Sequence, residues 1–207
     1  PVFSPDSRRV AYNAFKDGKV VCVIDEKESR RYDGVGTTIA FSPDSRRVAY
    51  NARMGGGWFV VLDGKEEKSY DSIKQGTPLF SPDSRKLIYG AKSGTGWFVV
   101  LDGEEGKHYD LLETPVFSLD SRQFAYGAQK DGGWFVVHNS REGRPYDDIV
   151  SDNPVFSPDG TRLAYIAQSR GKQIAVIDGK EEKAYDSVAE GSLLFSPDGK
   201  HAAYMAR

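Results

Sequence analysis

Short apolar segments alternate with polar turns along the whole chain, and the pattern repeats. The stretch "VFSPDSRRVAY" begins at Val2, and its "FSPD" core has close copies throughout the sequence. The copies begin every 37 to 39 residues, at Phe3, Phe41, Phe80, Phe117 (as "FSLD"), Phe156 and Phe195. A self-similar period of this size indicates a repeat architecture.

The first half of one unit, residues 38–52, predicts two strands joined by a tight turn. "TIAFS" is a short apolar segment, and the "SPDS" that overlaps its end is typical of a type I turn, with Pro43 at the second position. "RRVAYNA" then predicts a strand with Val48 and Tyr50 on one face. The aspartate of this turn is expected to accept hydrogen bonds within its own turn, not to bind a metal or act as an acid catalyst.

The second half of the unit predicts two more strands. "WFVVL" (58–62) is the strongest strand signal, Asp63-Gly64 is a favoured hairpin turn, and "KEEKSYD" (65–71) is a more polar strand. Four antiparallel strands in about 40 residues are typical of one blade of a β-propeller. We label these strands A to D, from the axis of the propeller outward.

The repeat "PVFSPDSRRVAY…GGGWFVVLDGKEEKSYD" resembles the WD-like propeller repeat of bacterial TolB-type proteins, whose hallmark is "SPDG" after the innermost strand. The resemblance covers the whole chain, and the last two copies carry "SPDG" itself. It implies a β-propeller fold and a bacterial protein in a periplasmic or extracellular setting.

The repeat predicts an all-β chain that forms one propeller domain over residues 1–207. The A–B half occurs six times and the C–D half five times. We therefore expect six blade positions with the last incomplete, and a C–D half placed before Pro1 would complete it. Five closed blades with a spare two-stranded arm are the alternative. The predicted units are 1–37, 38–76, 77–113, 114–152, 153–191 and the half unit 192–207.

One face of the propeller is the predicted binding surface, because the D–A and B–C loops meet there. The D–A loops carry Tyr-Asp pairs, the B–C loops carry cations, and tryptophans begin strand C in units two to four, whereas Val20 and Gln173 replace them in units one and five. Surface ion pairs and packing between blades would explain these residues without a ligand. A binding arc is the other interpretation, since tryptophan is enriched at interaction hot spots. The candidate binding residues are Trp58, Trp97, Trp134, Arg53, Lys92, Lys130, Asp71, Asp110 and Asp147.

Composition argues against several other functions. The formal net charge of −2 does not favour nucleic-acid binding, and the apolar runs are too short to cross a bilayer. A single cysteine excludes an internal disulfide or a cysteine-based zinc cluster. The three histidines occupy unrelated slots, and neither a "GxSxG" nucleophile motif nor a phosphate-binding glycine loop is present. We therefore expect no catalytic residues, metal or cofactor.

These observations predict a non-catalytic scaffold that binds a protein or peptide partner through the D–A/B–C face. Two alternatives remain open: a substrate-gating propeller of a larger enzyme, and an engineered or highly duplicated propeller without a ligand. The incomplete last blade also predicts self-association, because an unpaired strand edge invites pairing with another chain.

Overall fold

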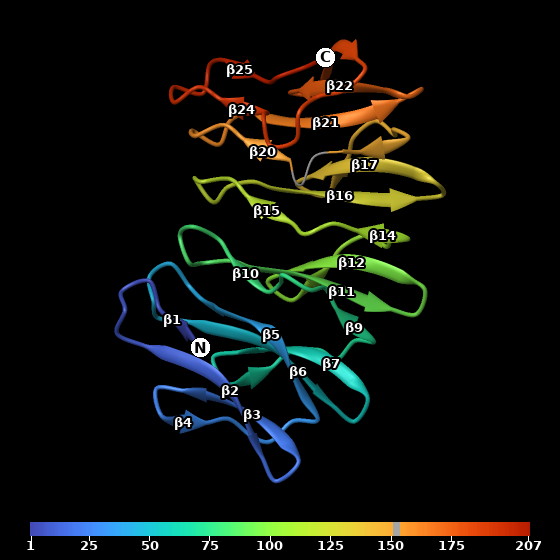
Figure 1. Ribbon diagram of the computed structural model, residues 1–207. Coiled ribbons are helices and arrows are strands. Elements are labelled where there is room, and N and C mark those ends of the chain that lie inside the picture. The colour runs from blue at the N-terminus through green and yellow to red at the C-terminus, as the bar shows by residue number, and fades with distance from the viewer. Residues whose placement is uncertain (151–153) are drawn as a thin grey trace. The chain divides into compact units, whose positions relative to one another are not determined.

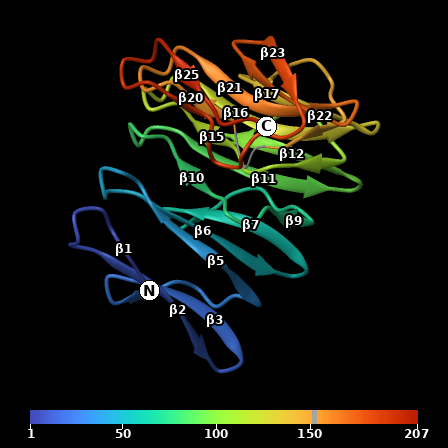
Figure 2. The same ribbon diagram turned by 45° about the horizontal axis from the view of Figure 1, so that its top comes forward.

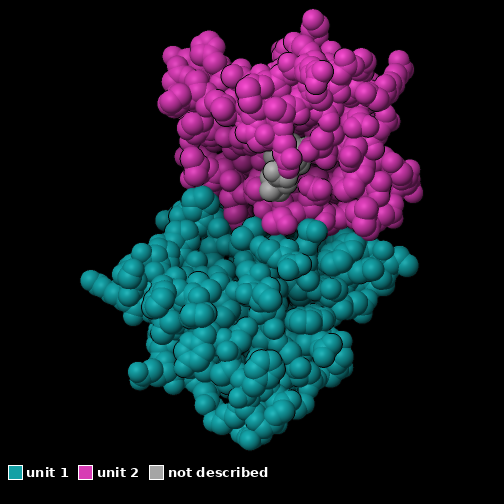
Figure 3. Space-filling view, viewed as in Figure 1, with its two compact units in different colours: residues 1–108 teal, residues 109–207 magenta. Residues whose placement is uncertain are grey.

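The computed structural model describes residues 1–150 and 154–207, and all its regular elements are β-strands joined by turns (Figure 1). The predicted boundary between the fourth and fifth units, at residues 152 and 153, lies outside the described residues. The chain divides into two compact units, Pro1–His108 and Tyr109–Arg207 (Figure 3), which we describe separately. No described segment is a helix long and apolar enough to span a bilayer.

Unit 1 contains three antiparallel sheets, which follow one another in chain order. The first sheet is β1 (Val2–Phe3), β2 (Val10–Lys16), β3 (Lys19–Ile24) and β4 (Lys27–Glu28). The second is β5 (Gly34–Phe41), β6 (Val48–Met54), β7 (Gly57–Leu62) and β8 (Lys65–Glu66). The third is β9 (Ser72–Ile73), β10 (Leu79–Phe80), β11 (Leu87–Ser93), β12 (Gly96–Leu101) and β13 (Glu104–Glu105).

Unit 2 continues the same pattern and ends with a smaller sheet. Its first sheet is β14 (Leu111–Leu112), β15 (Val116–Phe117), β16 (Phe124–Lys130), β17 (Gly133–His138) and β18 (Arg141–Glu142). Its second is β19 (Asp148–Ile149), β20 (Val155–Phe156), β21 (Leu163–Ser169), β22 (Lys172–Ile177) and β23 (Lys180–Tyr185). The last is β24 (Leu194–Phe195) and β25 (Ala202–Ala203). The predicted four-stranded antiparallel blades and the incomplete sixth one are therefore confirmed.

The repeated "SPDS" turn has the predicted hydrogen bond. The Ser45 amide donates to the Ser42 carbonyl at 2.8 Å, and the Asp44 carboxylate accepts from the Ser42 hydroxyl at 2.6 Å and the Arg46 amide at 3.1 Å. Ser45 has a φ of 64°, a left-handed conformation that glycine adopts at lower cost. The equivalent position 160 is glycine with a φ of 72°, and a Cβ there would lie 2.6 Å from an Asp120 carboxylate oxygen, so the Asp120 side chain would have to move.

The core lies between successive sheets, so that central strands are buried on both faces. On β6, Tyr50 and Ala52 pack with Cys22 of the preceding sheet, whereas Ala49 packs with Phe98 of the following sheet. Figure 2 shows the sheets of unit 1 arranged side by side in this way. Burial on both faces explains why "WFVVL" is a continuous apolar run and does not alternate.

The predicted fourth strand is shorter than expected in the first four blades. In the second blade, β8 spans only Lys65–Glu66, and pairing resumes at an isolated bridge between Trp58 and Tyr70. Glu66 pairs with Val61, so four residues of the outer strand match three of its partner. The extra residue is a bulge. In the fifth blade, β23 continues through a comparable register shift to Tyr185.

Candidate functional site

The D–A segments and the B–C turns meet at one edge of each sheet, which we call the loop face. In the third blade, β9 belongs to the D–A segment and pairs with the end of β11, where Lys92 lies opposite Ser72. Asp71 anchors this junction. Its amide donates to the Lys92 carbonyl at 2.9 Å, and its carboxylate accepts from the Gly94 amide at 2.7 Å.

Asp110 makes the corresponding contacts in unit 2. Its amide donates to the Gln129 carbonyl at 2.8 Å, and its carboxylate accepts from the Asp131 amide at 2.9 Å. Asp147 does the same with the Gln168 carbonyl at 2.9 Å and the Arg170 amide at 2.7 Å. All three candidate aspartates thus join a D–A segment to the B–C turn of the blade that follows it.

Asp33 shows how such a carboxylate responds to its surroundings. It accepts hydrogen bonds from the Lys19 ammonium at 2.5 Å and from the Gly55 amide at 2.9 Å. These bonds favour the ionised form, and together with the charges of Lys19 and Arg53 they lower the pKa of Asp33 below its ordinary value. The carboxylate is therefore ionised at neutral pH.

The tryptophans are half-buried at the start of strand C, and two of them contact cations in unit 1. Arg53 lies opposite Trp58 in the strand register, with its guanidinium carbon 5.7 Å from the ring centroid. Trp97 has two cations over its ring, because Lys92 Nζ lies 5.8 Å and Lys74 Nζ 6.0 Å from the centroid. Such contacts contribute about 0.5–1 kcal/mol each at exposed sites.

Lys74 was not among the residues predicted from the sequence. It lies in the D–A segment, and its amide donates to the Gly90 carbonyl at 2.8 Å, which holds this segment beside strand B of the third blade. Only the fold brings this position close to Trp97, although the two residues are far apart along the chain. A lysine in a D–A loop was the sequence signal available.

Lys130 is not placed against Trp134. The residue opposite Trp134 is Gln129, and Lys130 pairs with Gly133, one position further along β16. Because side chains alternate along a strand, Lys130 projects from the other face of the sheet. The cation and tryptophan therefore share one face in blades two and three but not in blade four. The predicted arc that joins Trp134 to the two tryptophans of unit 1 stays a prediction.

The cysteine, the histidines and the acidic residues of the described chain are the candidates for nucleophilic or metal chemistry. Cys22 is fully buried, and burial raises the pKa of its thiol to about 12, which disfavours the reactive thiolate. Of the histidines, His108 stacks on Phe98 with ring centroids 4.5 Å apart. Within residues 1–150 and 154–207, no group of three or more histidine, cysteine, aspartate or glutamate side chains is arranged to hold a metal ion.

Comparison with known proteins identifies the fold. No family model matches the chain, and no curated protein matches it in sequence. Among solved structures, TolB from Acinetobacter baumannii is similar over 86% of this chain and 51% of its own, with 18% identity and a TM-score of 0.50. A eukaryotic initiation factor is similar over 99% of this chain and 57% of its own, with 11% identity and a TM-score of 0.61.

These likenesses show a TolB-like β-propeller fold, as the repeat predicted. The chain spans about half the length of each of these two structures. At such low identity the likeness concerns the fold, and function has to be argued from the residues of this chain.

Proposed function

We propose that this propeller binds a protein or peptide segment through the loop face and carries no catalytic centre of its own. The strongest support comes from the side chains that surround Trp97. The ammonium groups of Lys74 and Lys92 both lie within about 6 Å of its half-buried indole, and neither lysine forms an ion pair with another described residue. Tryptophan and unpaired cations at a loop surface favour a partner that supplies acidic and apolar side chains.

The aspartates of the loop face have a supporting role in this proposal. Asp71 is bound to the backbone of the turn that follows Lys92, so it fixes the position from which the lysine projects. A binding surface on anchored turns loses less conformational entropy when a partner docks. The periplasmic or extracellular setting is also a proposal, and it rests on the TolB resemblance alone.

A peptide library displayed on phage tests the binding proposal. Peptides selected on the whole chain should be enriched in acidic and aromatic residues, and calorimetry should give the affinity of each. The double variant Lys74→Glu/Lys92→Glu should weaken binding at least about tenfold through charge repulsion. Trp97→Ala should cost about 2 kcal/mol or more of binding free energy, as a hot-spot residue does. Lys65→Glu, on exposed β8 of the second blade and away from the loop face, is the control for charge reversal and should bind normally.

The thermal stability of Trp97→Ala separates binding from packing. Replacing a core tryptophan with alanine lowers the free energy of unfolding by about 3–5 kcal/mol. Trp97 is only half-buried, so we expect a smaller loss and a folded variant. The proposal is wrong if Trp97→Ala is strongly destabilised while the lysine variants bind the selected peptides as well as the parent does.

A further inference from the structure

The same niche recurs between neighbouring blades but differs in size within the two units. The niche lies between strand B and the start of strand C of one blade and the D–A segment that leads to the next. Between blades two and three, Asn51, Trp58, Ile73 and Gln75 line a cavity of about 210 Å³. At the equivalent positions of blades five and six, the residues are Ile166, Gln173, Val188 and Glu190.

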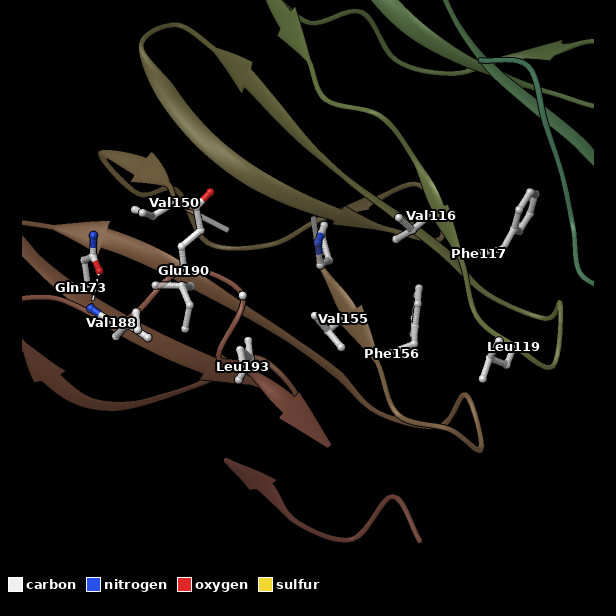
Figure 4. A pocket seen from close by; sticks show the side chains of 14 residues that line it. Val116, Phe117, Leu119, Val150, Val155, Phe156, Gln173, Val188, Glu190 and Leu193 are labelled. Carbon is white, nitrogen blue, oxygen red and sulfur yellow. Dashed lines mark hydrogen bonds between the residues drawn. The ribbon is translucent and has the colours of Figure 1, made fainter. Parts of the chain in front are cut away.

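The niche of unit 2 is much larger, and it has glutamine in place of the indole. Its cavity has a volume of about 730 Å³ and reaches along β15 and β20 (Figure 4). Gln173 stands where blades two to four have tryptophan, and its side chain accepts a hydrogen bond from the Val188 amide at 2.6 Å. This bond ties the short side chain to the wall of the cavity.

The lining of this cavity is apolar with one charge. Figure 4 shows Phe117, Leu119 and Phe156 at one end and Glu190 beside Val150 at the other. Glu190 is exposed, and it forms no ion pair with a described residue. It is also the only charged side chain among the described residues that line the cavity.

The polarity and charge of the lining also differ between the two niches. Asn51 of the second blade becomes Ile166, which is 5% exposed, and Gln75 becomes Glu190. The Asn51 amide is thus replaced by an apolar side chain, the indole by the Gln173 amide, and a neutral side chain at the rim by an anionic one. The volume falls in the range of about 300–1,000 Å³ that is typical of small-molecule sites, which combine an apolar lining with a few orienting polar groups.

We infer that this cavity binds a small ligand with an apolar body and a single cationic group. The body lies between the A strands β15 and β20 and the side chains of Ile166 and Leu193, and the cation lies at the Glu190 carboxylate. Charge complementarity selects the cation, because no basic side chain lines the described part of the wall. The site lies in unit 2 and does not use Trp97, Lys74 or Lys92, so it is independent of the proposed peptide binding.

Three eight-carbon probes test the ligand class on the whole chain: octylammonium, 1-octanol and octanoate, each titrated by calorimetry below its aggregation limit. Octylammonium should bind about threefold to fivefold more tightly than octanol, as an exposed ion pair allows. Octanoate should bind most weakly. Equal binding of all three, or no saturable binding of octylammonium, overturns the proposal.

Two variants locate the site. Gln173→Trp restores the residue of blades two to four, should occupy the part of the cavity beside Val188, and should weaken octylammonium binding at least about tenfold with the melting temperature unchanged or raised. Val20→Trp places the same residue at the equivalent strand C position of the first blade and should leave binding unchanged. If Gln173→Trp fails to fold, Ile166→Asn provides the same test with the residue of the second blade. Undiminished binding by the folded variant overturns the proposal.

Glu190→Gln tests the charge. This variant should bind octanol as the parent does but lose its preference for octylammonium. Glu182→Gln, on exposed β23, removes one charge from another part of the surface and should keep the preference. A preference that survives in Glu190→Gln contradicts the assignment of the carboxylate.

Discussion

The aspartate of each Ser-Pro-Asp turn stabilises its own turn, and in the first two blades its residue also contacts the next blade. Its carboxylate holds its own turn, and in the second blade the Asp44 amide also donates to the Ser84 hydroxyl of the next blade at 2.9 Å. The hydrogen bond from Ser42 is the largest cause that lowers the pKa of Asp44, followed by the bond from the Arg46 amide. Hydrogen bonds to the ionised form explain why the aspartate recurs without a ligand to bind.

These lowered pKa values predict loss of stability in acid. The pKa is also lowered at the equivalent aspartates Asp6, Asp120, Asp159 and Asp198. A carboxyl whose pKa is lower in the folded state stabilises the fold fully above the unfolded value, near pH 4, and loses that effect as the pH falls through the folded value. The urea concentration at the midpoint of unfolding should therefore fall as the pH is lowered below about 4.

Asp44→Asn checks the residue responsible. The variant should be less stable than the parent at pH 7, and the difference should shrink in acid because the parent carboxyl is then protonated too. Glu104→Gln, on exposed β13, changes the charge equally and should follow the parent. A constant difference between Asp44→Asn and the parent at all pH values would contradict the role of ionisation.

Within each blade, the outer strand supplies the ring that joins it to the next blade. Tyr70 of the second blade packs edge-on against Tyr89 of the third, with centroids 6.3 Å apart, and its hydroxyl donates to the Glu105 carboxylate at 3.0 Å. Burial is the main cause that raises the pKa of Tyr70 to about 12, so the hydroxyl stays protonated and can donate. The bulge in the outer strand comes just before this tyrosine.

Substitutions in this pair should distinguish the contribution of the ring to stability from that of the hydroxyl. Tyr89 is 1% exposed, so Tyr89→Ala should cost about 3–5 kcal/mol of unfolding free energy as a buried aromatic does. Tyr70→Phe keeps the ring and removes one hydrogen bond to a carboxylate, which should cost about 1–2 kcal/mol. Urea unfolding of both variants measures the difference. Equal losses would contradict the larger contribution of the ring.

At the scale of the whole molecule, repetition made the architecture predictable from the sequence. Turn residues, strand patterns and their period recur six times, and the A–B halves outnumber the C–D halves by one. The bulge was not predictable, because the extra residue has no signature of its own. The contact between Lys74 and Trp97 and the enlarged niche at Gln173 were not predictable either, since each joins residues of different strands. That residues 1–207 form one domain stays a prediction.

The last sheet leaves surface that a complete blade would cover. β24 and β25 pair with each other, and beyond them an isolated bridge joins Val188 to Ala206. Within the described residues, no third strand pairs with β25. Leu193 and Phe195 pack inward against Ala164 and Ala175 of the preceding blade, so the half blade belongs to the core of unit 2. That the outer edge of β25 pairs with another chain stays a prediction.

A C–D half fused after Arg207 should complete this blade. The added segment would be a copy of residues 93–110, which form the end of strand B, the turn, strands C and D and the Tyr-Asp pair of the third blade. Its strand C would pair with β25 and bury apolar side chains at about 25 cal/mol per Å². The melting temperature should therefore rise, and self-association, measured by sedimentation at several concentrations, should fall. A glycine- and serine-rich extension of the same length is the control and should change neither. If the added half behaves like this extension, the edge of β25 is not an open pairing site and the last sheet is complete with two strands.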